Sequence, residues 1–429
     1  MKKLLILAGA GPHCKVVESA KKMGIYTIVA DYLNNSPAKL IADESLMCNI
    51  TNVNYLTEYC KKNNVSGVLN FCIDPAQVPA QIVAEKCGLP SFGNKEQIIS
   101  FTNKKAFKEF CRKCDVDIIP EYNEKQIDND NILYPVIVKP VDSRGSRGCA
   151  ICNNKQELIL AIPFSKKESS DGNVIIEKYM ENCQDLTISY LVKDGEPELV
   201  SVGDRFSGSK QDGLDKQLAC TIQPSRYTKF YIDNVNNRVK SMIRTLGIQN
   251  GPVFMQGFVD VNTVRMYDPG IRFPGNEYER ILEKATGIDL MKSLITYVVG
   301  GRVDTHNVNI VDCYDLNGKC AIQYMINLKE GEIAVFDGFQ EISEHPNVID
   351  IQQRYFIGDR IYNTGDILQR AGEISILIDR NIKKIEEVIE FIQSKLVINN
   401  IEGDNMIISP IDIKLIKRYY NSENYFNNF

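Results

Sequence analysis

A lysine closes an apolar, β-branched run immediately before a loop of small and basic residues. The stretch YPVIVKPVDSRGSRGC spans residues 134 to 149, and Lys139 is its only lysine. The loop that follows consists of Ser143, Arg144, Gly145, Ser146, Arg147 and Gly148. An ammonium group beside free main-chain N–H groups suits phosphate oxygens. No Gly-Lys-Ser/Thr follows, so the loop is not of the Walker type, and a plain surface turn is the alternative for this stretch alone.

A second glycine turn lies in the stretch GAGPHC, residues 9 to 14. Gly9 and Gly11, together with Asp31 at the end of the next apolar run, match half of a dinucleotide-binding fingerprint, but the third glycine is missing. The match is weak support for NAD, since Asp31 can equally end a strand of any doubly wound sheet. The same turn before a helix also suits an anionic substrate group. We expect His13 either to assist there or to be an exposed loop residue without a role.

The elements around this turn alternate between strand and helix. Apolar runs predict strands at residues 4–8, 26–31, 46–50 and 67–71, and helical patterns lie at 12–23, 53–62 and 76–86. Apolar strands between helices indicate a parallel sheet covered on both faces. Ligands of such sheets bind at the carboxyl ends of the strands. We therefore predict a doubly wound domain over residues 1–93.

The pattern changes after residue 93. A helix is predicted at 103–114, an acidic, Asn-rich connector at 123–131, and then a small αββαβ unit of the size of a lid. Hairpin strands around residue 194, a helix near 231–246 and the strand pair VFMQGFVDV and VRMYDPG follow. The last 130 residues contain strands around 322, 333, 374–378 and before 403, with a helix at 382–395. The fold class is α/β, and α+β in part, with expected domains at 1–93, 94–300 (lid about 131–180) and 301–429.

Composition sets the broad class of protein. The 429 residues carry a formal net charge of −5, with 44% hydrophobic and 24% charged residues. This is typical of a globular protein and lacks the basic surface of a nucleic-acid binder. The N-terminal apolar run is too short for a signal peptide and no stretch is long enough to span a bilayer, so we expect a cytoplasmic protein. The thirteen cysteines, including the pairs Cys111/Cys114 and Cys149/Cys152, are expected to be small apolar side chains rather than zinc ligands.

The order of the motifs resembles that of the ATP-grasp enzymes, most closely the biotin carboxylase and carbamoyl-phosphate synthetase branch, over nearly the whole chain. In this resemblance Lys104 is similar to the family's first phosphate-binding lysine and Lys139 to the second. The stretch EKYMEN, residues 177 to 182, is similar to the hinge that binds adenine, and Asp185 lies where the family places a ribose contact. The nucleotide-binding residues that the resemblance implies are Lys104, Lys139, Arg144, Gly145, Ser146, Arg147, Gly148, Glu177, Lys178, Tyr179, Met180 and Asp185.

The metal region departs from the family pattern. ATP-grasp enzymes usually carry a glutamate and, a dozen residues later, Glu-x-Asn-x-Arg, whereas this chain has Gln256 and then DPGIR, with Asp268, Gly270 and Arg272. Magnesium, or manganese in its place, accepts an amide oxygen but loses a charge that balances its own. The resemblance implies Gln256 and Asp268 as metal ligands, with Asp268 and Arg272 acting on the transferred phosphoryl group. A second metal is left open, and tying down its own loop is the alternative role for Arg272.

These residues imply an ATP-dependent carboxylate–amine ligase that forms an acyl phosphate and releases ADP and phosphate. Two lysines and two arginines can offset a triphosphate, and acyl transfer from a carboxylate needs magnesium in addition. The alternative is a nucleotide-binding protein that has lost catalysis, and retention of both lysines, Asp268 and Arg272 favours the ligase. By resemblance a carboxylase that activates bicarbonate is a further alternative, but the chain has no Met-Lys-Met type context for a biotinyl-lysine.

Small-molecule carboxylate and amine substrates are the expected partners, and the carboxylase resemblance implies a homodimer. Asp204-Arg205 and Arg226 are candidates for gripping the acceptor, with an ordinary surface role as the alternative. Otherwise we expect the lysine-rich helix face to be solvated; its members are Lys104, Lys105, Lys108, Arg112 and Lys113. The sequence does not specify which carboxylate or amine is used.

Overall fold

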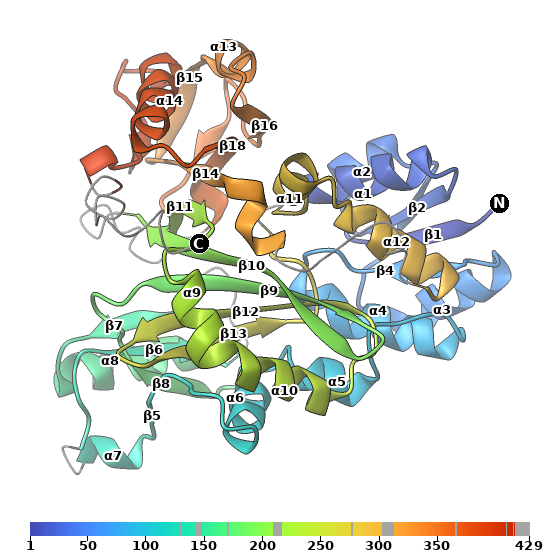
Figure 1. The fold of residues 1–429 in the computed structure, drawn as a ribbon, viewed down its shortest axis with the longest axis horizontal. Coiled ribbons are helices and arrows are strands. Elements are labelled where there is room, and N and C mark those ends of the chain that lie inside the picture. The colour runs from blue at the N-terminus through green and yellow to red at the C-terminus, as the bar shows by residue number, and fades with distance from the viewer. Residues whose placement is uncertain are drawn as a thin grey trace.

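Three sheets and a three-stranded C-terminal ribbon build the molecule (Figure 1). The computed structural model describes residues 1–128, 131–141, 148–169, 171–208, 217–275, 278–302, 313–364, 367–408, 410–414 and 416. Within this part of the chain, no helix has both the length and the apolar character needed to cross a membrane.

The N-terminal sheet is parallel throughout and has the strand order β3-β2-β1-β4, which confirms the predicted doubly wound arrangement. Its strands are β1 (Lys3–Leu7), β2 (Tyr26–Asp31), β3 (Glu44–Met47) and β4 (Gly67–Leu69). Its helices are α1 (Gly11–Lys22), α2 (Pro37–Ile41), α3 (Val53–Lys62) and α4 (Asp74–Lys86). The short helix α2 was not predicted, because five residues are too few to show a helical period.

The lid is an antiparallel sheet of order β5-β8-β6-β7 with helix α8 packed on it. Its elements are β5 (Glu121–Tyr122), β6 (Val136–Pro140), β7 (Ala150–Cys152), α8 (Lys155–Lys167) and β8 (Val174–Lys178). The helices α5 (Lys95–Ser100) and α6 (Lys104–Lys113) precede it, and the short α7 (Lys125–Asp128) lies in the expected connector. The predicted hairpin of β6 and β7 is confirmed by the pairing of Val138 with Ala150.

A large antiparallel sheet forms the centre of the molecule. Its order is β13-β12-β9-β10-β11-β14-β18-β16, with β20 on β14, so strands from both sides of residue 300 share it. The strands are β9 (Asp185–Lys193), β10 (Glu196–Ser207), β11 (Leu218–Gln223), β12 (Gly251–Asp260), β13 (Thr263–Gly270), β14 (Lys319–Leu328), β16 (Val348–Gln353), β18 (Arg370–Asp379) and β20 (Ile407–Ile408). The predicted helix near 231–246 is α9 (Thr228–Tyr231), a π-helical turn (Ile232–Asn236) and α10 (Asn237–Leu246).

The C-terminal part adds a ribbon of order β17-β15-β19 and two helices. These elements are β15 (Gly331–Asp337), α13 (Phe339–Ser343), β17 (Arg360–Ile361), α14 (Ile382–Lys395) and β19 (Val397–Asn400). Isoleucines of α14, including Ile385 and Ile389, pack with Ile322 and Ile376 of the central sheet in one apolar cluster. This cluster covers one face of the sheet at its β14 and β18 side.

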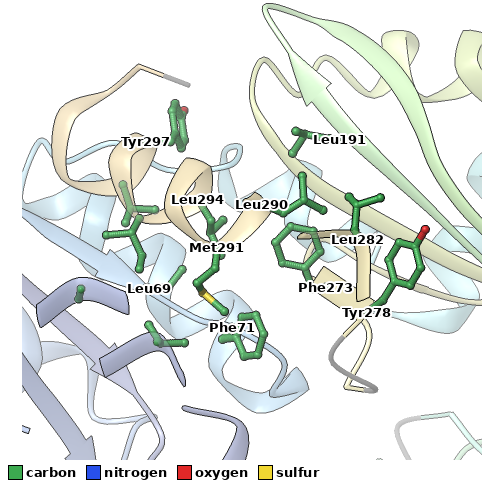
Figure 2. Packing of buried hydrophobic residues seen from close by; sticks show 14 of the residues in the cluster. Leu69, Phe71, Leu191, Phe273, Tyr278, Leu282, Leu290, Met291, Leu294 and Tyr297 are labelled. Carbon is green, nitrogen blue, oxygen red and sulfur yellow. The ribbon is translucent and has the colours of Figure 1, made fainter. Parts of the chain in front are cut away.

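The opposite face of that side of the sheet meets the N-terminal domain through helices α11 (Tyr278–Thr286) and α12 (Leu290–Gly300). Figure 2 shows Met291 and Leu294 of α12 on the side of Leu69 and Phe71, whereas Leu282 of α11 lies on the side of Leu191 in β9. These residues belong to a single buried cluster, so the N-terminal sheet and the central sheet are held against each other by apolar contact. Any group placed between the two sheets beside this cluster is largely removed from water.

Gly67 sets how closely α12 approaches the N-terminal sheet. A Cβ atom at this position would lie 2.3 Å from the main-chain oxygen of Val298. Gly67→Ala is therefore expected to lower the free energy of unfolding by about 1–3 kcal/mol through overpacking. Gly11→Ala is the control, because a Cβ there meets nothing within 4 Å. Urea denaturation measures both variants, and a Gly67→Ala protein as stable as the parent would contradict this close approach.

Candidate functional site

The lid brings a lysine and a carboxylate together on adjacent strands. Lys139 lies on β6 and Glu177 on β8, and β6 pairs with β8 in antiparallel register. The Nζ atom of Lys139 is 2.5 Å from Oε2 of Glu177. The Glu177 side chain is completely buried, so its charge depends on this ion pair and on those that follow.

Helix α6 supplies two more ammonium groups from the same face. Asn103 caps the helix by accepting a hydrogen bond from the N–H of Ala106 at 3.0 Å. Lys104 and Lys108 are four residues apart and therefore lie one above the other. Lys108 forms a salt bridge with Glu177 and a 2.8 Å hydrogen bond with Glu121 of β5. The expectation of a solvated lysine face is wrong for Lys108, whose side chain is fully buried.

Burial and neighbouring charges shift the pKa values of these lysines. Burial lowers the pKa of Lys139 well below its ordinary value, and the nearby charges of Lys108 and Lys104 lower it further. Burial also lowers the pKa of Lys108 to about 8, although Glu121 opposes the shift. An added polyanion would favour the charged form of both amines. The site is therefore suited to a ligand with several negative charges.

The central sheet contributes the predicted metal ligands. Gln256 on β12 lies directly opposite Asp268 on β13, so the structure places the two predicted ligands side by side. Oδ1 of Asp268 is 3.4 Å from the Nζ atom of Lys104. The carboxylate oxygen of Asp268 and the amide oxygen of Gln256 are donors that Mg²⁺ accepts. Among the described residues, no three His, Cys, Asp or Glu side chains group into a further metal site.

Asp185, the predicted ribose contact, already forms hydrogen bonds within the chain. Its Oδ2 atom accepts a 2.8 Å hydrogen bond from Nε of Arg205, and the hydroxyl of Tyr267 lies 3.0 Å from Oδ1. Burial raises the pKa of Asp185, while Arg205 acts in the opposite direction. The ring of Tyr267 in turn lies 5.7 Å from the Nζ atom of Lys139. Tyr267 thus links Asp185 to the lysine cluster.

Arg272 is held by several groups at once. Its Nε atom donates a 2.6 Å hydrogen bond to Asp74 of α4, its Nη1 atom donates to the main-chain oxygen of Phe273 at 2.9 Å, and its guanidinium lies 4.5 Å from the Phe254 ring centroid. Arg272 thus holds its own loop in place, which is the alternative role predicted for it. The contact with Asp74 also fixes the arginine to the N-terminal domain.

The hinge residues lie where the lid joins the central sheet. The side chain of Lys178 donates to the main-chain oxygens of Leu133 and Tyr134, and the N–H of Tyr179 donates to the oxygen of Pro135 at 3.0 Å. Within the described part of the chain, the N–H of Met180 makes no hydrogen bond. The loop residues Arg144, Gly145, Ser146 and Arg147 lie outside the described residues.

Gly148 ends this loop at a crowded position. Its φ is +67°, and a Cβ atom there would lie 2.7 Å from Cβ of Glu168. The main-chain oxygen of Gly148 accepts a 2.6 Å hydrogen bond from the hydroxyl of Ser165 on α8. The glycine is therefore required by packing against α8, whatever the loop binds.

The N-terminal turn differs from the expectation. Asp31 accepts a 2.7 Å hydrogen bond from the N–H of Gly9 and another from Leu33, so it shapes the turn. His13 is not an exposed loop residue, because it lies in α1, is fully buried and contacts the edge of Phe71. Burial lowers the pKa of His13 to about 4, so the ring is neutral at pH 7 and cannot attract an anion as a cation.

The candidates for gripping an acceptor are also not ordinary surface residues. Asp204 is fully buried and accepts hydrogen bonds from the hydroxyl of Ser225 at 2.6 Å and the N–H of Arg226 at 3.2 Å. Arg205 is paired with Asp185, and the guanidinium of Arg226 stacks 4.8 Å from the ring centroid of Tyr227. The surface alternative is therefore wrong for Asp204, which shapes the turn after β11.

Sequence reasoning missed four participants in this site: Lys108, Glu121, Asp74 and Tyr267. Only Lys108 had a usable sequence feature, since it follows Lys104 by one helical turn. Glu121 lies in a two-residue strand, and Asp74 and Tyr267 reach the site through contacts between segments far apart in sequence.

Comparison with known proteins finds two family models in this chain. The model described as carbamoyl-phosphate synthase L chain, ATP binding domain, matches residues 103–305. The model described as PylC-like, N-terminal domain, matches residues 4–79. The first match contains every described residue of the lysine cluster and of the Gln256/Asp268 pair.

Relatives and solved structures extend the similarity. The chain is 22% identical over 254 residues to the formate-dependent phosphoribosylglycinamide formyltransferase of Prochlorococcus marinus strain NATL1A, covering 57% of this chain and 64% of the relative. An L-amino acid ligase from Bacillus licheniformis has a similar fold, with a TM-score of 0.76, 17% identity and coverage of 93% and 99%. The biotin carboxylase domain of the 2-oxoglutarate carboxylase from Hydrogenobacter thermophilus, solved with MgADP and bicarbonate, has a TM-score of 0.73, 17% identity and coverage of 100% and 95%.

The lysine environment predicts that binding of a triphosphate is linked to proton uptake. The lowered pKa of Lys108, about 8, and that of Lys139 mean that the free protein loses these protons as the pH rises. A bound polyanion raises both pKa values, so affinity for a non-hydrolysable ATP analogue is expected to fall about tenfold between about pH 7.5 and about pH 9.5.

Isothermal titration in buffers of different ionisation enthalpy measures the proton uptake directly. Lys108→Met removes one titrating group, so the uptake near pH 8 is expected to decrease in this variant. An affinity that is constant across the range, with no protons taken up, would show that the lysine environment is wrongly described.

Proposed function

Because the chain belongs to the ATP-grasp superfamily, we propose that it is an ATP-dependent ligase that joins a small carboxylate to an amine through an acyl phosphate. The alignment with the formyltransferase spans 64% of that relative, so the activity of the whole relative is not transferred to this chain. The proposal rests on the residues of the site itself.

The observation that carries the proposal is the convergence of Lys104, Lys108 and Lys139 beside the buried Glu177. The lysines come from α6 and from β6 of the lid, and they meet next to the Gln256/Asp268 pair of the central sheet. Ammonium groups on one side and metal-ligand oxygens on the other are what a triphosphate with its cation needs. The hinge N–H of Met180 supplies a donor of the kind that an adenine edge requires.

The residues present fit a magnesium ion, with one carboxylate fewer than the family pattern. Asp268 and Gln256 would hold it, and when bound it would neutralise charge on the phosphate oxygens. Lys104 forms an ion pair with Asp268, and this lysine would turn to phosphate once a cation replaces it at that carboxylate. Burial opposes the charge on Lys104, but Asp268 outweighs it and raises the pKa of the lysine.

The proposed reaction has two displacements. A substrate carboxylate oxygen attacks the γ-phosphorus of ATP, the bond from that phosphorus to the bridging oxygen breaks, and ADP leaves with the electron pair. An amine nitrogen then attacks the acyl carbon, the carbon–nitrogen bond forms, the carbon–oxygen bond to phosphate breaks, and the nitrogen releases its protons to solvent. The part of the chain is to position the reactants and stabilise charge. Arg272, fixed by Asp74, would steady the phosphoryl group in transfer.

The relatives named above are enzymes, which favours the ligase over a binding protein without catalysis. Retention of both lysines, Asp268 and Arg272 supports the same choice. Small-molecule substrates are expected for this chain. A homodimer, implied by the carboxylase resemblance, is part of the proposal.

Substitution of the lysines tests the nucleotide site. Lys139→Ala is expected to weaken binding of a non-hydrolysable ATP analogue at least tenfold, because it removes a buried charge-assisted contact and leaves Glu177 underpaired. Lys105→Ala is the matched control, since Lys105 is an exposed neighbour of Lys104 on the same helix. Equal affinity in the Lys139→Ala and Lys105→Ala proteins would remove Lys139 from the site.

Asp268→Asn separates binding from turnover. Affinity for the nucleotide is expected to stay within about threefold of the parent, whereas ADP release falls at least a hundredfold because a charge that helps to hold the metal is lost. The assay is phosphate release across paired amino acids, amines and small carboxylic acids. ATP binding without turnover over the whole panel would contradict the ligase and support a protein that has lost catalysis.

A further inference from the structure

A row of polar side chains crosses six strands of the central sheet on one face. Direct cross-strand pairs connect its members in order: Asp185, Arg205, Thr221, Gln323, Ser375 and Asp350. Hydrogen bonds continue along it, from Thr221 to Gln323 at 3.0 Å and from Gln323 to Glu373 at 3.1 Å. One end of the row is the Asp185/Tyr267 contact of the nucleotide site. The other end lies where the sheet meets α1 and α11.

At that far end, one set of charges is internally satisfied. Asp350 of β16 accepts a 2.9 Å hydrogen bond from Lys15 of α1 and also pairs with Arg280 of α11. These contacts join the N-terminal domain, α11 and the central sheet. Asp350 therefore has a structural use and needs no further ligand.

A second set of charges beside it is not satisfied. Glu279 of α11 is 3% exposed and Glu373 of β18 is 1% exposed. Among the described residues, no other residue donates a hydrogen bond to either oxygen of Glu279, and Oε2 of Glu373 is 3.9 Å from Nη1 of Arg370, too far for a hydrogen bond. Arg370 is itself 7% exposed, and its Nε atom has no partner among the described residues. Two carboxylates and one guanidinium are thus buried with atoms that can form further hydrogen bonds.

Buried charged groups lower the stability of the fold unless hydrogen bonds or ion pairs satisfy them. Burial raises the pKa of Glu279 to about 7, with the charge of Glu373 adding to the shift while Lys15 and Arg280 oppose it. Burial likewise raises the pKa of Glu373 and lowers that of Arg370 to about 10. A buried charge without a partner destabilises the fold. The unpaired oxygens of Glu279, Oε2 of Glu373 and Nε of Arg370 are explained if a ligand supplies the missing partners.

The polar row connects the unsatisfied groups to the Asp185 end of the site, because Gln323 of the row donates a hydrogen bond to Glu373. The pKa of Cys72, which burial raises to about 12, is affected by Arg272 and also by Glu279 and Arg354. Cys72 is thus within electrostatic range of both Arg272 and Glu279. On the sheet, Gln223 and Thr187 also have buried side-chain atoms without hydrogen-bond partners among the described residues, and Thr187 pairs directly with Gln256.

We propose that Glu279, Glu373 and Arg370 form the binding subsite for a zwitterionic substrate, an amino acid whose ammonium group binds the two carboxylates and whose carboxylate binds the arginine. This inference rests on the proposed ligase function and adds the class of substrate to it. A dicarboxylate would place its second acid group against Glu279 and Glu373, and a diamine would leave Arg370 without a partner. Only a molecule with one group of each sign satisfies all three side chains.

Direct binding without turnover tests the subsite. Equilibrium dialysis of the full chain with saturating non-hydrolysable ATP analogue and magnesium is run against the radiolabelled protein amino acids. For an amino acid that binds, its N-acetyl derivative and its decarboxylated amine are expected to bind at least about tenfold more weakly, since each lacks one charge-assisted contact. Equal binding of either analogue overturns the proposal, as does the absence of binding by every amino acid.

Charge-neutral variants assign the contacts. Glu279→Gln and Arg370→Gln are each expected to weaken amino acid binding at least about tenfold while affinity for the ATP analogue stays within about twofold. Glu283→Gln is the matched control, because Glu283 is exposed one turn further along α11 and receives the same change. Parent-like amino acid affinity in Glu279→Gln overturns the assignment.

A stability measurement shows that a loss of binding is not a loss of fold. An acidic group whose pKa is higher in the folded state than in the unfolded state destabilises the fold as the pH rises above its unfolded-state pKa. Glu279→Gln should therefore raise the melting temperature at about pH 8 and have little effect at about pH 5. A lower melting temperature at pH 8 would mean that Glu279 is structurally paired and would overturn its role. Failure of the ATP analogue to bind would instead reject the proposed function, so the two ideas fail separately.

Discussion

Glu177 has no exposed surface, and two lysines from different elements provide its charge balance. A buried carboxylate is tolerated only when ion pairs and hydrogen bonds replace its hydration. This requirement draws Lys108 of α6 and Lys139 of the lid to the same point, and Lys108 extends the link to Glu121. The lid is thereby connected to the helix that carries Lys104. The arrangement of Lys104, Lys108 and Lys139 depends on this one carboxylate, because without it the neighbouring ammonium groups would repel one another.

The remaining polar groups between the domains fall into two kinds. Some are completed within the chain: Arg272 by Asp74, Asp185 by Arg205 and Tyr267, and Asp350 by Lys15 and Arg280. Others, which include Glu279, Glu373 and Arg370, have side-chain atoms without a hydrogen-bond partner among the described residues. The completed pairs hold the N-terminal domain, the helices and the central sheet in fixed positions relative to one another. Glu279, Glu373 and Arg370 are where we propose that substrate binds, because a ligand there gains contacts that the described residues do not supply.

The apolar cluster in Figure 2 strengthens the electrostatic interactions of both kinds of polar group. Leu282 and Leu294 exclude water from the boundary between the two sheets, and charges beside them act at a lower effective dielectric constant. An unpaired carboxylate such as Glu279 is then both costly to the fold and selective toward a cation. The same packing explains why the pKa of His13 is lowered and why this ring is removed from the set of charged groups. Apolar packing thus decides which titratable side chains can serve the site.

The sequence by itself determined the parallel N-terminal sheet, the lid hairpin and the strand pair that carries Gln256 and Asp268, because these follow from local hydrophobic periods and turn residues. It also singled out Lys104 and Lys139, through the resemblance of their motifs to those of ATP-grasp enzymes. It could not determine burial that arises between distant segments. For that reason Lys108 was expected to be solvated, Asp204 to be a surface residue and His13 to be exposed. Only the tertiary structure decided which charges meet and which are left without partners, since such contacts depend on how α1, α6 and α11 pack against the two sheets.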